Sequence, residues 1–265
     1  MTKSDATSAT KVSQCCTLSN QRQGQGHINS SRHAVIILAS GLSLRLGRSK
    51  QLLSKDGVPL IHYMIQLALA TQPRAVIVVI PNNNPAIINA IAELIVEEPR
   101  IHTVVNPEPE TGMAHSLFLG IEALANTKST LDSTFVNRVL IMGIDQVLLD
   151  EQHLTSLLAG IHIVLASGYR HLDEKRLNEP YLNESRTNGA ASINSSKEHI
   201  VGLPIAIDCE RLKQWQSALI GDKGLRHLIR ALPSHQISTL INDQLSYDID
   251  TPEQYAYAKQ QGWLD

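Results

Sequence analysis

Apolar runs and amphipathic stretches alternate along the 265-residue chain. Short runs rich in Val, Ile and Leu predict buried strands, and longer amphipathic stretches predict helices. Strands are predicted over residues 34–39, 75–80, 101–105, 138–143, 161–166, 202–207 and 236–241. Helices are predicted over residues 58–71, 85–97, 113–125, 150–159, 209–219, 224–231 and 252–261. This alternation predicts an α/β fold with a Rossmann-like, mainly parallel sheet and helices on both faces.

Two segments depart from this rhythm. Residues 1–32 are rich in Ser, Thr, Gln, Asn and Gly, and we expect a disordered tail, because so few apolar residues cannot offset the entropy of ordering. Residues 168–200 are crowded with polar and charged residues and predict a long polar excursion. The rest of the chain, residues 33–265, is predicted to form a single domain.

Composition narrows the possible functions. A formal net charge of -2 gives no bulk attraction to nucleic acid or to an anionic membrane, and an aromatic content of 4% leaves little material for stacking bases. The three cysteines form neither a disulfide framework nor a zinc pattern. The sequence shows no apolar stretch typical of a signal peptide or a membrane helix. We therefore expect a cytoplasmic protein that binds neither nucleic acid nor membranes.

The first candidate for chemistry is the segment at 34–53, AVIILASGLSLRLGRSKQLL. A strand that is apolar on both faces runs directly into a loop that carries Arg45 and Lys50. Gly41 and Gly47 are expected to take backbone angles closed to other residues, so that successive amide groups point at one anion. The loop matches neither the Walker A pattern nor G-x-G-x-x-G. It predicts a phosphate-binding loop of another kind or, alternatively, an ordinary strand-to-helix turn.

Carboxylates follow two other predicted elements. Asp145 stands just past the strand at 138–143, and Asp248 and Asp250 stand two residues apart before a Pro-initiated helix. Asp145 could simply start a turn, and Asp250 or Thr251 could be only a helix N-cap. Mg²⁺, however, commonly takes one or two protein carboxylates together with substrate phosphates. Loop cations and carboxylates together predict phosphoryl-type chemistry on a nucleoside triphosphate with Mg²⁺ as cofactor.

These residues together resemble the MobA-like nucleotidyltransferase superfamily, whose loop runs L-[AG]-[AG]-G-x-S-x-R-[ML]-G-x-x-K. The corresponding loop here is LASGLSLRLGRSK, from Leu38 to Lys50. Four further segments are most similar to the molybdenum cofactor cytidylyltransferase branch: QLL at 51–53, GMAHSL at 112–117, GDKG at 221–224 and DIDTP at 248–252. The motifs follow the order of the family across residues 34–258.

The resemblance implies a fold of the nucleotide-diphospho-sugar transferase type and a Mg²⁺-dependent transfer of a nucleoside monophosphate to the phosphate of a small acceptor, with release of pyrophosphate. In the similar branch the substrates are CTP and molybdopterin, and a molybdoenzyme or its chaperone is implied as protein partner. The implied catalytic residues are Arg45, Lys50 and Asp145. The implied nucleotide-binding residues are Leu38, Ala39, Ser40, Gly41, Arg45, Lys50, Gly112 and Ser116. The implied metal ligands are Asp145 and Asp250, with Asp248 as the nearby alternative.

Three positions depart from the pattern of the superfamily. Ser40 stands where members often carry Ala or Gly, Val147 replaces the proline of D-x-P, and Leu203 replaces the histidine of G-H-P. These departures leave three alternatives open: GMP transfer from GTP, transfer to another phosphorylated acceptor such as a sugar or alcohol phosphate, and a molybdenum cofactor carrier without turnover.

Overall fold

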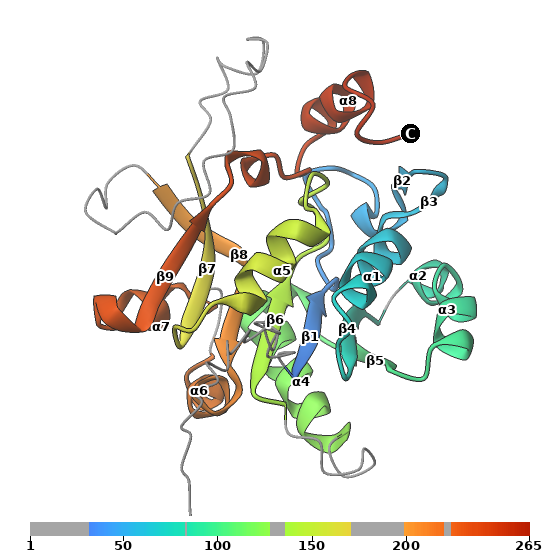
Figure 1. Ribbon diagram of the computed structural model, residues 1–265. Coiled ribbons are helices and arrows are strands. Elements are labelled where there is room, and N and C mark those ends of the chain that lie inside the picture. The colour runs from blue at the N-terminus through green and yellow to red at the C-terminus, as the bar shows by residue number, and fades with distance from the viewer. Residues whose placement is uncertain (1–31, 83, 128–135, 171–198, 220–223) are drawn as a thin grey trace, which may run out of the picture. The chain divides into compact units, whose positions relative to one another are not determined.

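A seven-stranded sheet forms the centre of the computed structural model, which describes residues 32–82, 84–127, 136–170, 199–219 and 224–265 (Figure 1). Its strands lie in the order β5-β4-β1-β6-β8-β7-β9. The strand β8 runs antiparallel to both of its neighbours, and the other neighbouring pairs are parallel. The mainly parallel α/β architecture predicted from the sequence is confirmed. The strands are β1 His33–Leu38, β4 Val76–Pro81, β5 Ile101–Asn106, β6 Arg138–Met142, β7 Val164–Arg170, β8 His199–Asp208 and β9 Ile237–Ile241.

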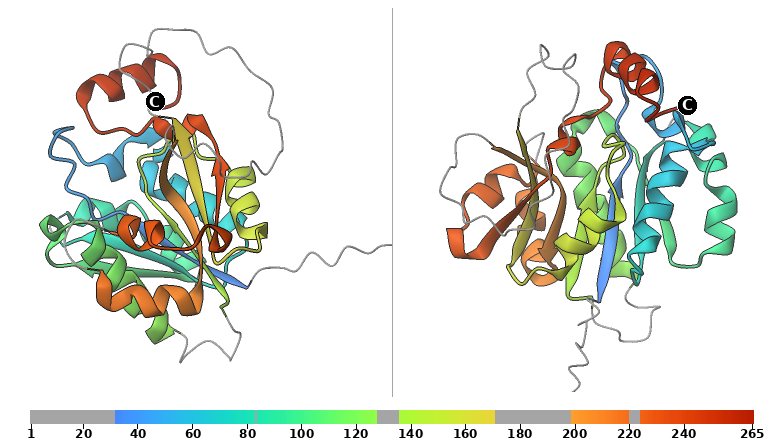
Figure 2. Two further views of the ribbon diagram at one scale, coloured as in Figure 1. Left: turned by 90° about the vertical axis from the view of Figure 1, so that its left-hand side faces the viewer. Right: turned by 45° about the horizontal axis from the view of Figure 1, so that its top comes forward.

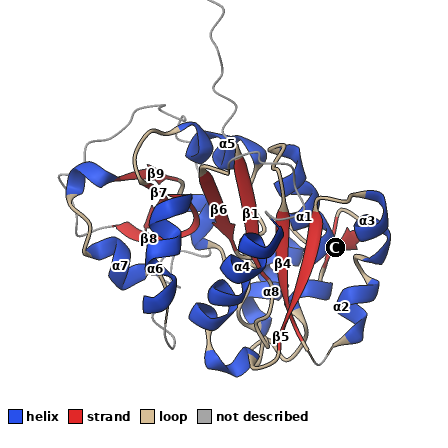
Figure 3. Ribbon diagram, turned by 90° about the horizontal axis from the view of Figure 1, so that it is seen from below, coloured by secondary structure: helices blue, strands red, loops and turns tan. Residues whose placement is uncertain are grey.

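Helices cover both faces of this sheet, as the two views in Figure 2 show. The larger core cluster lies on the face covered by α1 Leu60–Ala70 and α5 Glu151–Ala159. It also includes Ala258 of α8 Pro252–Gln260, a helix that lies beyond the end of the sheet at the top of Figure 1. The short helices α2 Pro85–Asn89 and α3 Ala92–Glu97 extend this cluster. The second cluster lies beneath α4 Met113–Thr127, α6 Cys209–Trp215 and α7 Arg226–Arg230. Figure 3 shows the sheet between these two layers. Among the described helices, none is long and apolar enough to cross a membrane.

The strand β1 is buried on both faces because its alternate side chains enter different cores. Val35 and Ile37 belong to the α1 side, whereas Ala34 and Ile36 belong to the α4 side. The helix α4 packs closely because Gly120 faces Ile36: a Cβ atom at Gly120 would lie 2.7 Å from the Ile36 Cγ2. Because both faces of β1 are buried, every position of the strand after His33 carries an apolar side chain.

Several predicted elements have other bounds in the structure. The helix predicted over 85–97 is broken into α2 and α3 at Ile91, whose φ of -124° leaves the helical region. Clustered β-branched residues weaken helix propensity there. The helix predicted over 58–71 begins only at Leu60, because Ser54–Lys55 (β2) and Val58–Pro59 (β3) form a hairpin instead. Asp56 and Gly57 have positive φ values of 52° and 78° at its turn, the geometry that favours two-residue hairpins.

The strand β7 also differs from its prediction. It begins at Val164 rather than at residue 161 and continues to Arg170, where it pairs with β8 at His199. Hydrogen bonding to both β8 and β9 outweighs the polar character of its last residues. The predicted excursion therefore overlaps both strand ends. Its interior, residues 171–198, and all of the predicted tail except Arg32 lie outside the described residues.

A buried histidine contacts β7 where its pairing register with β8 shifts, between Ala166 and Ser167. His153 of α5 is 6% exposed and shares a hydrogen bond of 2.8 Å with the Ser167 hydroxyl. Ser167 donates in turn to the Pro204 carbonyl, also at 2.8 Å. Burial lowers the pKa of His153 to about 4, although the charge of Asp150 acts in the opposite direction. The imidazole is therefore neutral in the folded protein at physiological pH.

This burial makes stability depend on pH. Between pH ~6.5 and ~4 the unfolded chain protonates His153 and the folded protein does not, so folding stability falls as the pH drops, by up to roughly 1.4 kcal/mol per pH unit. We expect urea unfolding between pH 7 and pH 5 to show a shallower decline for His153→Gln than for the wild type. Equal slopes in the two proteins would contradict this assignment.

Candidate functional site

The sheet reverses its direction of winding between β1 and β6. From β1 the chain continues to β4 and β5 on one side, whereas β6 pairs with the other side of β1 in parallel register, with Ile37 opposite Met142. Ligands in open α/β sheets bind at the carboxyl ends of strands beside such a reversal. The loop after β1 and the residues after β6 both leave the sheet at this end, in the upper part of Figure 1.

The loop at residues 39–53 is shaped by hydrogen bonds. The buried Gln51 amide donates to the carbonyls of Ala39, at 2.7 Å, and Gly41, at 3.0 Å. Gly47 has a φ of 69°, as predicted, but Gly41 is not among the glycines with positive φ; Ser43 takes that conformation, with a φ of 53°. A Cβ atom on Gly41 would meet nothing within 4 Å. The expectation of a special backbone angle at Gly41 was wrong, and what the residue provides is open space beside the loop.

The three charged residues of the predicted catalytic set belong to one ion cluster, in which Asp250 links Arg45 to Lys50. Lys50 Nζ lies 3.2 Å from Asp145 Oδ2 and also donates to Asp250 Oδ1. Arg45 Nη2 donates to Asp250 Oδ2 at 2.6 Å. The Lys50 side chain is 11% exposed, whereas that of Arg45 is 74% exposed. The site thus contains a buried ammonium between two partly exposed carboxylates, with a second cation at its outer edge.

Charge and burial act against each other at this cluster. Burial alone would lower the pKa of Lys50, but the carboxylates of Asp145 and Asp250 outweigh it and raise the pKa above the ordinary lysine range. The half-buried Asp248 has its pKa raised, first by burial and then by the charges of Asp145 and Asp250. Lys50 is therefore cationic, and burial makes the ionised form of Asp248 less favourable, with the charges of Asp145 and Asp250 acting in the same direction.

Main-chain contacts bring the late segment to Asp145. The Ile249 amide donates to the Asp145 carbonyl at 3.3 Å, and Gln146 pairs with Asp248 in an isolated β-bridge. The buried side chain of Gln146 donates to the carbonyls of Leu203, at 2.8 Å, and Leu245, at 3.2 Å. Gln146 thus joins the end of β6 to β8 and to the segment that carries Asp248.

The cap of α8 resolves one of the alternatives from the sequence. Thr251 is the N-cap: its hydroxyl accepts from the Gln254 amide at 3.3 Å, and the Gln254 side chain accepts from the Thr251 amide at 3.0 Å. The carboxylate of Asp250 is left for Lys50 and Arg45. Asp250 is consequently not a simple capping residue.

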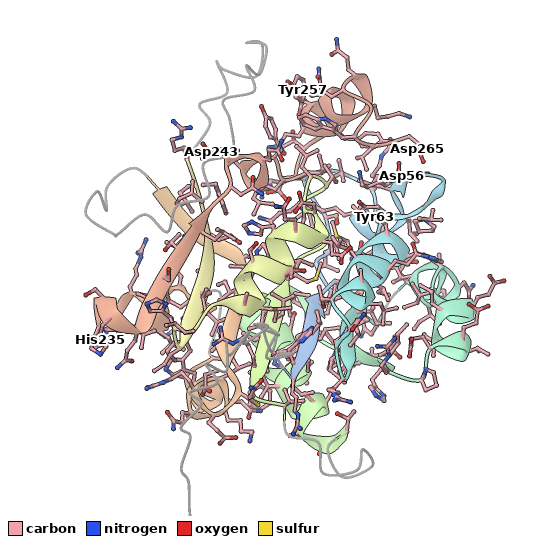
Figure 4. All side chains as sticks on the ribbon, viewed as in Figure 1. Asp56, Tyr63, His235, Asp243, Tyr257 and Asp265 are labelled. Carbon is pink, nitrogen blue, oxygen red and sulfur yellow. The ribbon has the colours of Figure 1, made fainter. Side chains whose placement is uncertain are left out.

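The hairpin that follows the loop is tied to the end of the described chain. The Asp265 carboxylate accepts from the Ser54 hydroxyl at 2.5 Å and from the Gly57 amide at 2.8 Å, and Figure 4 shows Asp265 beside Asp56 at the hairpin turn. The segment that follows Lys50 and the helix that follows Asp250 are therefore fastened together.

A pocket of about 220 Å³ opens beside the cluster. It is lined by Leu38, Ser40, Gly41, Ser43, Lys50, Pro109, Gly112, Met113, Ser116, Gly143, Ile144, Asp145 and Leu203. Six of the eight nucleotide-binding residues implied by the resemblance are in this lining. Of the other two, Ala39 is fully buried behind the loop and Arg45 is bound to Asp250. Asp248 and Asp250 do not line the pocket.

A buried hydroxyl pair forms one wall of the pocket. Ser40 Oγ and Ser116 Oγ are 2.6 Å apart, and the fully buried Asn106 donates to Ser116 Oγ at 3.1 Å. Gly112 precedes α4 with a φ of 99°, a conformation that favours glycine. Sequence reasoning missed Asn106 and the bridging role of Gln146. The only signal for Asn106 was its place directly after an apolar strand.

The donor set can be tested against the implied metal. Among the described residues, no three acidic, His or Cys side chains are grouped so as to hold a metal ion. Asp145 and Asp250 nevertheless hold one cation, the ammonium of Lys50, between them. Two carboxylates fit the needs of Mg²⁺, which completes its shell with water and phosphate oxygens. The assignment of Asp145, Asp248 and Asp250 as ligands stays a prediction.

The chain matches a known protein family. The model of the MobA-like NTP transferase domain matches residues 35–237, which is well over half of the chain. A search among curated proteins finds no match.

Solved structures share the fold at low sequence identity. A nucleotidyl transferase from Methanothermobacter thermautotroptrophicus is 15% identical, with 87% of this chain and 97% of that chain covered and a TM-score of 0.61. The 4-diphosphocytidyl-2C-methyl-D-erythritol synthase of Anaerococcus prevotii is 16% identical, with 88% and 98% covered and a TM-score of 0.57. Rv0371c of Mycobacterium tuberculosis, in complex with manganese, is 16% identical, with 85% and 96% covered and a TM-score of 0.53. The predicted fold type is confirmed.

The cap of α8 provides a test of the local structure beside Asp250. Thr251→Ala removes the acceptor for the Gln254 amide and should lower the free energy of unfolding by about 1 kcal/mol. Thr251→Ser keeps a hydroxyl and should cost much less. Urea denaturation at pH 7 measures both. If the alanine variant were as stable as the serine variant, the cap would have no energetic role.

Proposed function

Since this chain belongs to the family of MobA-like NTP transferase domains, we propose that it transfers CMP from CTP to the phosphate of a molybdopterin-type acceptor and releases pyrophosphate. The acceptor phosphate oxygen attacks the α-phosphorus of CTP, and the bond from that phosphorus to the bridging oxygen of the β-phosphate breaks. The observation that carries this proposal is the meeting of Arg45 and Lys50 with Asp145 and Asp250 beside the pocket.

The residues of this chain have distinct tasks in the proposed reaction. Lys50 and Arg45 bind the triphosphate and stabilise the charge that develops on the leaving pyrophosphate. The open loop at Gly41 admits the phosphates, and Gly112 and Ser116 lie against the base or ribose. Positioning of this kind contributes much of the rate enhancement in phosphoryl-type transfer.

Asp145 and Asp250 are the residues that would hold Mg²⁺. When bound, the metal neutralises phosphate charge and supports the in-line geometry of transfer. The manganese complex of Rv0371c supports a divalent ion in this fold, and the pair of carboxylates around one cation supports the choice of ligands here. Asp248 is the alternative ligand, because its backbone pairs with Gln146, the residue after Asp145, in an isolated β-bridge.

The identity of the acceptor is supported by sequence motifs alone. The segments at 112–117, 221–224 and 248–252 support the molybdopterin-type acceptor. Leu203 favours a second candidate, transfer to a different phosphorylated acceptor, because an aliphatic side chain lines the pocket where the similar family carries an imidazole. The same enzyme chemistry would serve both acceptors, so the choice between them is made by experiment.

The function is tested by incubating the purified protein with Mg²⁺, each of the four nucleoside triphosphates, and either molybdopterin or a panel of sugar and alcohol phosphates. We expect pyrophosphate and the dinucleotide product to form fastest with CTP and molybdopterin. A preference for GTP would replace CMP by GMP, and product only with another acceptor would establish the second candidate. If none of the four nucleoside triphosphates gave pyrophosphate release, the proposal would be contradicted.

The role of Asp145 separates an enzyme from a cofactor carrier. Asp145→Asn should reduce turnover by roughly a hundredfold or more, because the lost charge acts on the transition state, while molybdopterin binding persists. The matched control is Asp56→Asn, which makes the same change at an exposed hairpin turn where Asn tolerates a positive φ. Turnover that survives Asp145→Asn unchanged would remove Asp145 from the reaction.

A further inference from the structure

The ammonium of Lys50 stands where a metal ion would be held. It contacts Asp145 Oδ2 at 3.2 Å and Asp250 Oδ1 at hydrogen-bond distance, so one cationic group bridges the two carboxylates assigned above to the metal. Only 11% of the Lys50 side chain is exposed. The two carboxylates therefore compensate the charge of a largely buried side chain.

A divalent ion and this ammonium exclude each other. Mg²⁺ binds carboxylate oxygens at about 2.0–2.1 Å and demands a near-ideal octahedral shell, which a bridging lysine blocks. The two positive charges would also repel each other across the same oxygens. A metal ion bound between Asp145 and Asp250 must therefore displace Lys50 from its bridging position, and a largely buried ammonium that loses both partners is costly unless a new anion receives it.

The pocket supplies a place for that anion. Lys50 lines the pocket together with Ser40, Gly41 and Ser43 of the same loop. Its flexible four-carbon stem lets the ammonium move from the carboxylates to a phosphate. Arg45, with a side chain that is 74% exposed, is likewise able to leave Asp250 for the triphosphate. A bound triphosphate thus draws both cations away from the carboxylates.

We propose that Lys50 is the resident cation of the metal site, so that the site admits a divalent ion together with a triphosphate and discriminates against the free ion. This inference rests on the proposed function for the triphosphate pocket. Lys50 has two successive partners: the carboxylates before the substrate binds, and the phosphates afterwards. Because coupling of binding equilibria is reciprocal, the metal must raise triphosphate affinity by the same factor by which triphosphate raises metal affinity.

The test measures Mn²⁺ binding directly, by electron paramagnetic resonance of free Mn²⁺, with no acceptor and no turnover. Wild-type protein should bind Mn²⁺ weakly alone and about tenfold or more tightly with a non-hydrolysable CTP analogue, within the usual range of coupling. Lys50→Met should bind Mn²⁺ alone about tenfold more tightly than the wild type and lose most of the effect of the analogue. Lys55→Met is the matched control, because Lys55 lies on the hairpin, 4.8 Å from the Tyr63 ring, and should behave as the wild type.

The outcomes distinguish this inference from the proposed function. If Lys50→Met binds free Mn²⁺ no more tightly than the wild type, Lys50 is not the resident cation, whatever the nucleotide does. If Lys50→Met tightens Mn²⁺ binding but no triphosphate binds the wild-type protein, the resident cation stands and the proposed function fails. Arg45→Gln changes an exposed side chain and is the second test variant, to be used if Lys50→Met fails to fold. It should tighten Mn²⁺ binding by a smaller factor, and unchanged binding would contradict the inference.

Discussion

The ion cluster around Lys50 holds the site together because it joins three distant parts of the chain. Lys50 follows β1, Asp145 follows β6, and Asp250 precedes α8. An ammonium with an 11% exposed side chain requires nearby negative charge, which Asp145 and Asp250 supply. Lys50 gains these two partners only when the fold has brought Asp145 and Asp250 to the carboxyl edge of the sheet.

Neutral amides give this charged cluster its geometry. The Gln51 side chain donates hydrogen bonds to two carbonyls of the loop. The Gln146 side chain donates to one carbonyl of β8 and to the Leu245 carbonyl in the late segment. The Asn106 side chain donates to the Ser116 hydroxyl in the wall of the pocket. Each lies in the interior, where an unmade hydrogen bond is costly and a made one fixes a direction. Apolar packing on both faces of β1 positions the strand, but these amides orient the groups that leave its end.

The parts of the structure that depend on local pattern could be predicted from the sequence. The strand before the loop and the place of Asp145 were readable because burial on two faces leaves an apolar run with a sharp end. The sequence placed Lys50 and Asp250 in one predicted site, but their direct contact, across 200 residues of chain, appears only in the structure. Asn106 and Gln146 were missed because a neutral amide acquires its role from partners that only folding supplies. The extension of β7 was missed because strand pairing, rather than local polarity, determines it.

In the proposed reaction one site receives both the triphosphate and the metal, and Lys50 passes from the carboxylates to the phosphates. A crystal structure with Mn²⁺ and a non-hydrolysable CTP analogue would show both ligands at once. We expect an anomalous peak for Mn²⁺ between Asp145 and Asp250, triphosphate density in the pocket, and the Lys50 ammonium on phosphate oxygens. Mn²⁺ bound elsewhere, or Lys50 still bridging the two carboxylates while the analogue occupies the pocket, would contradict this proposal.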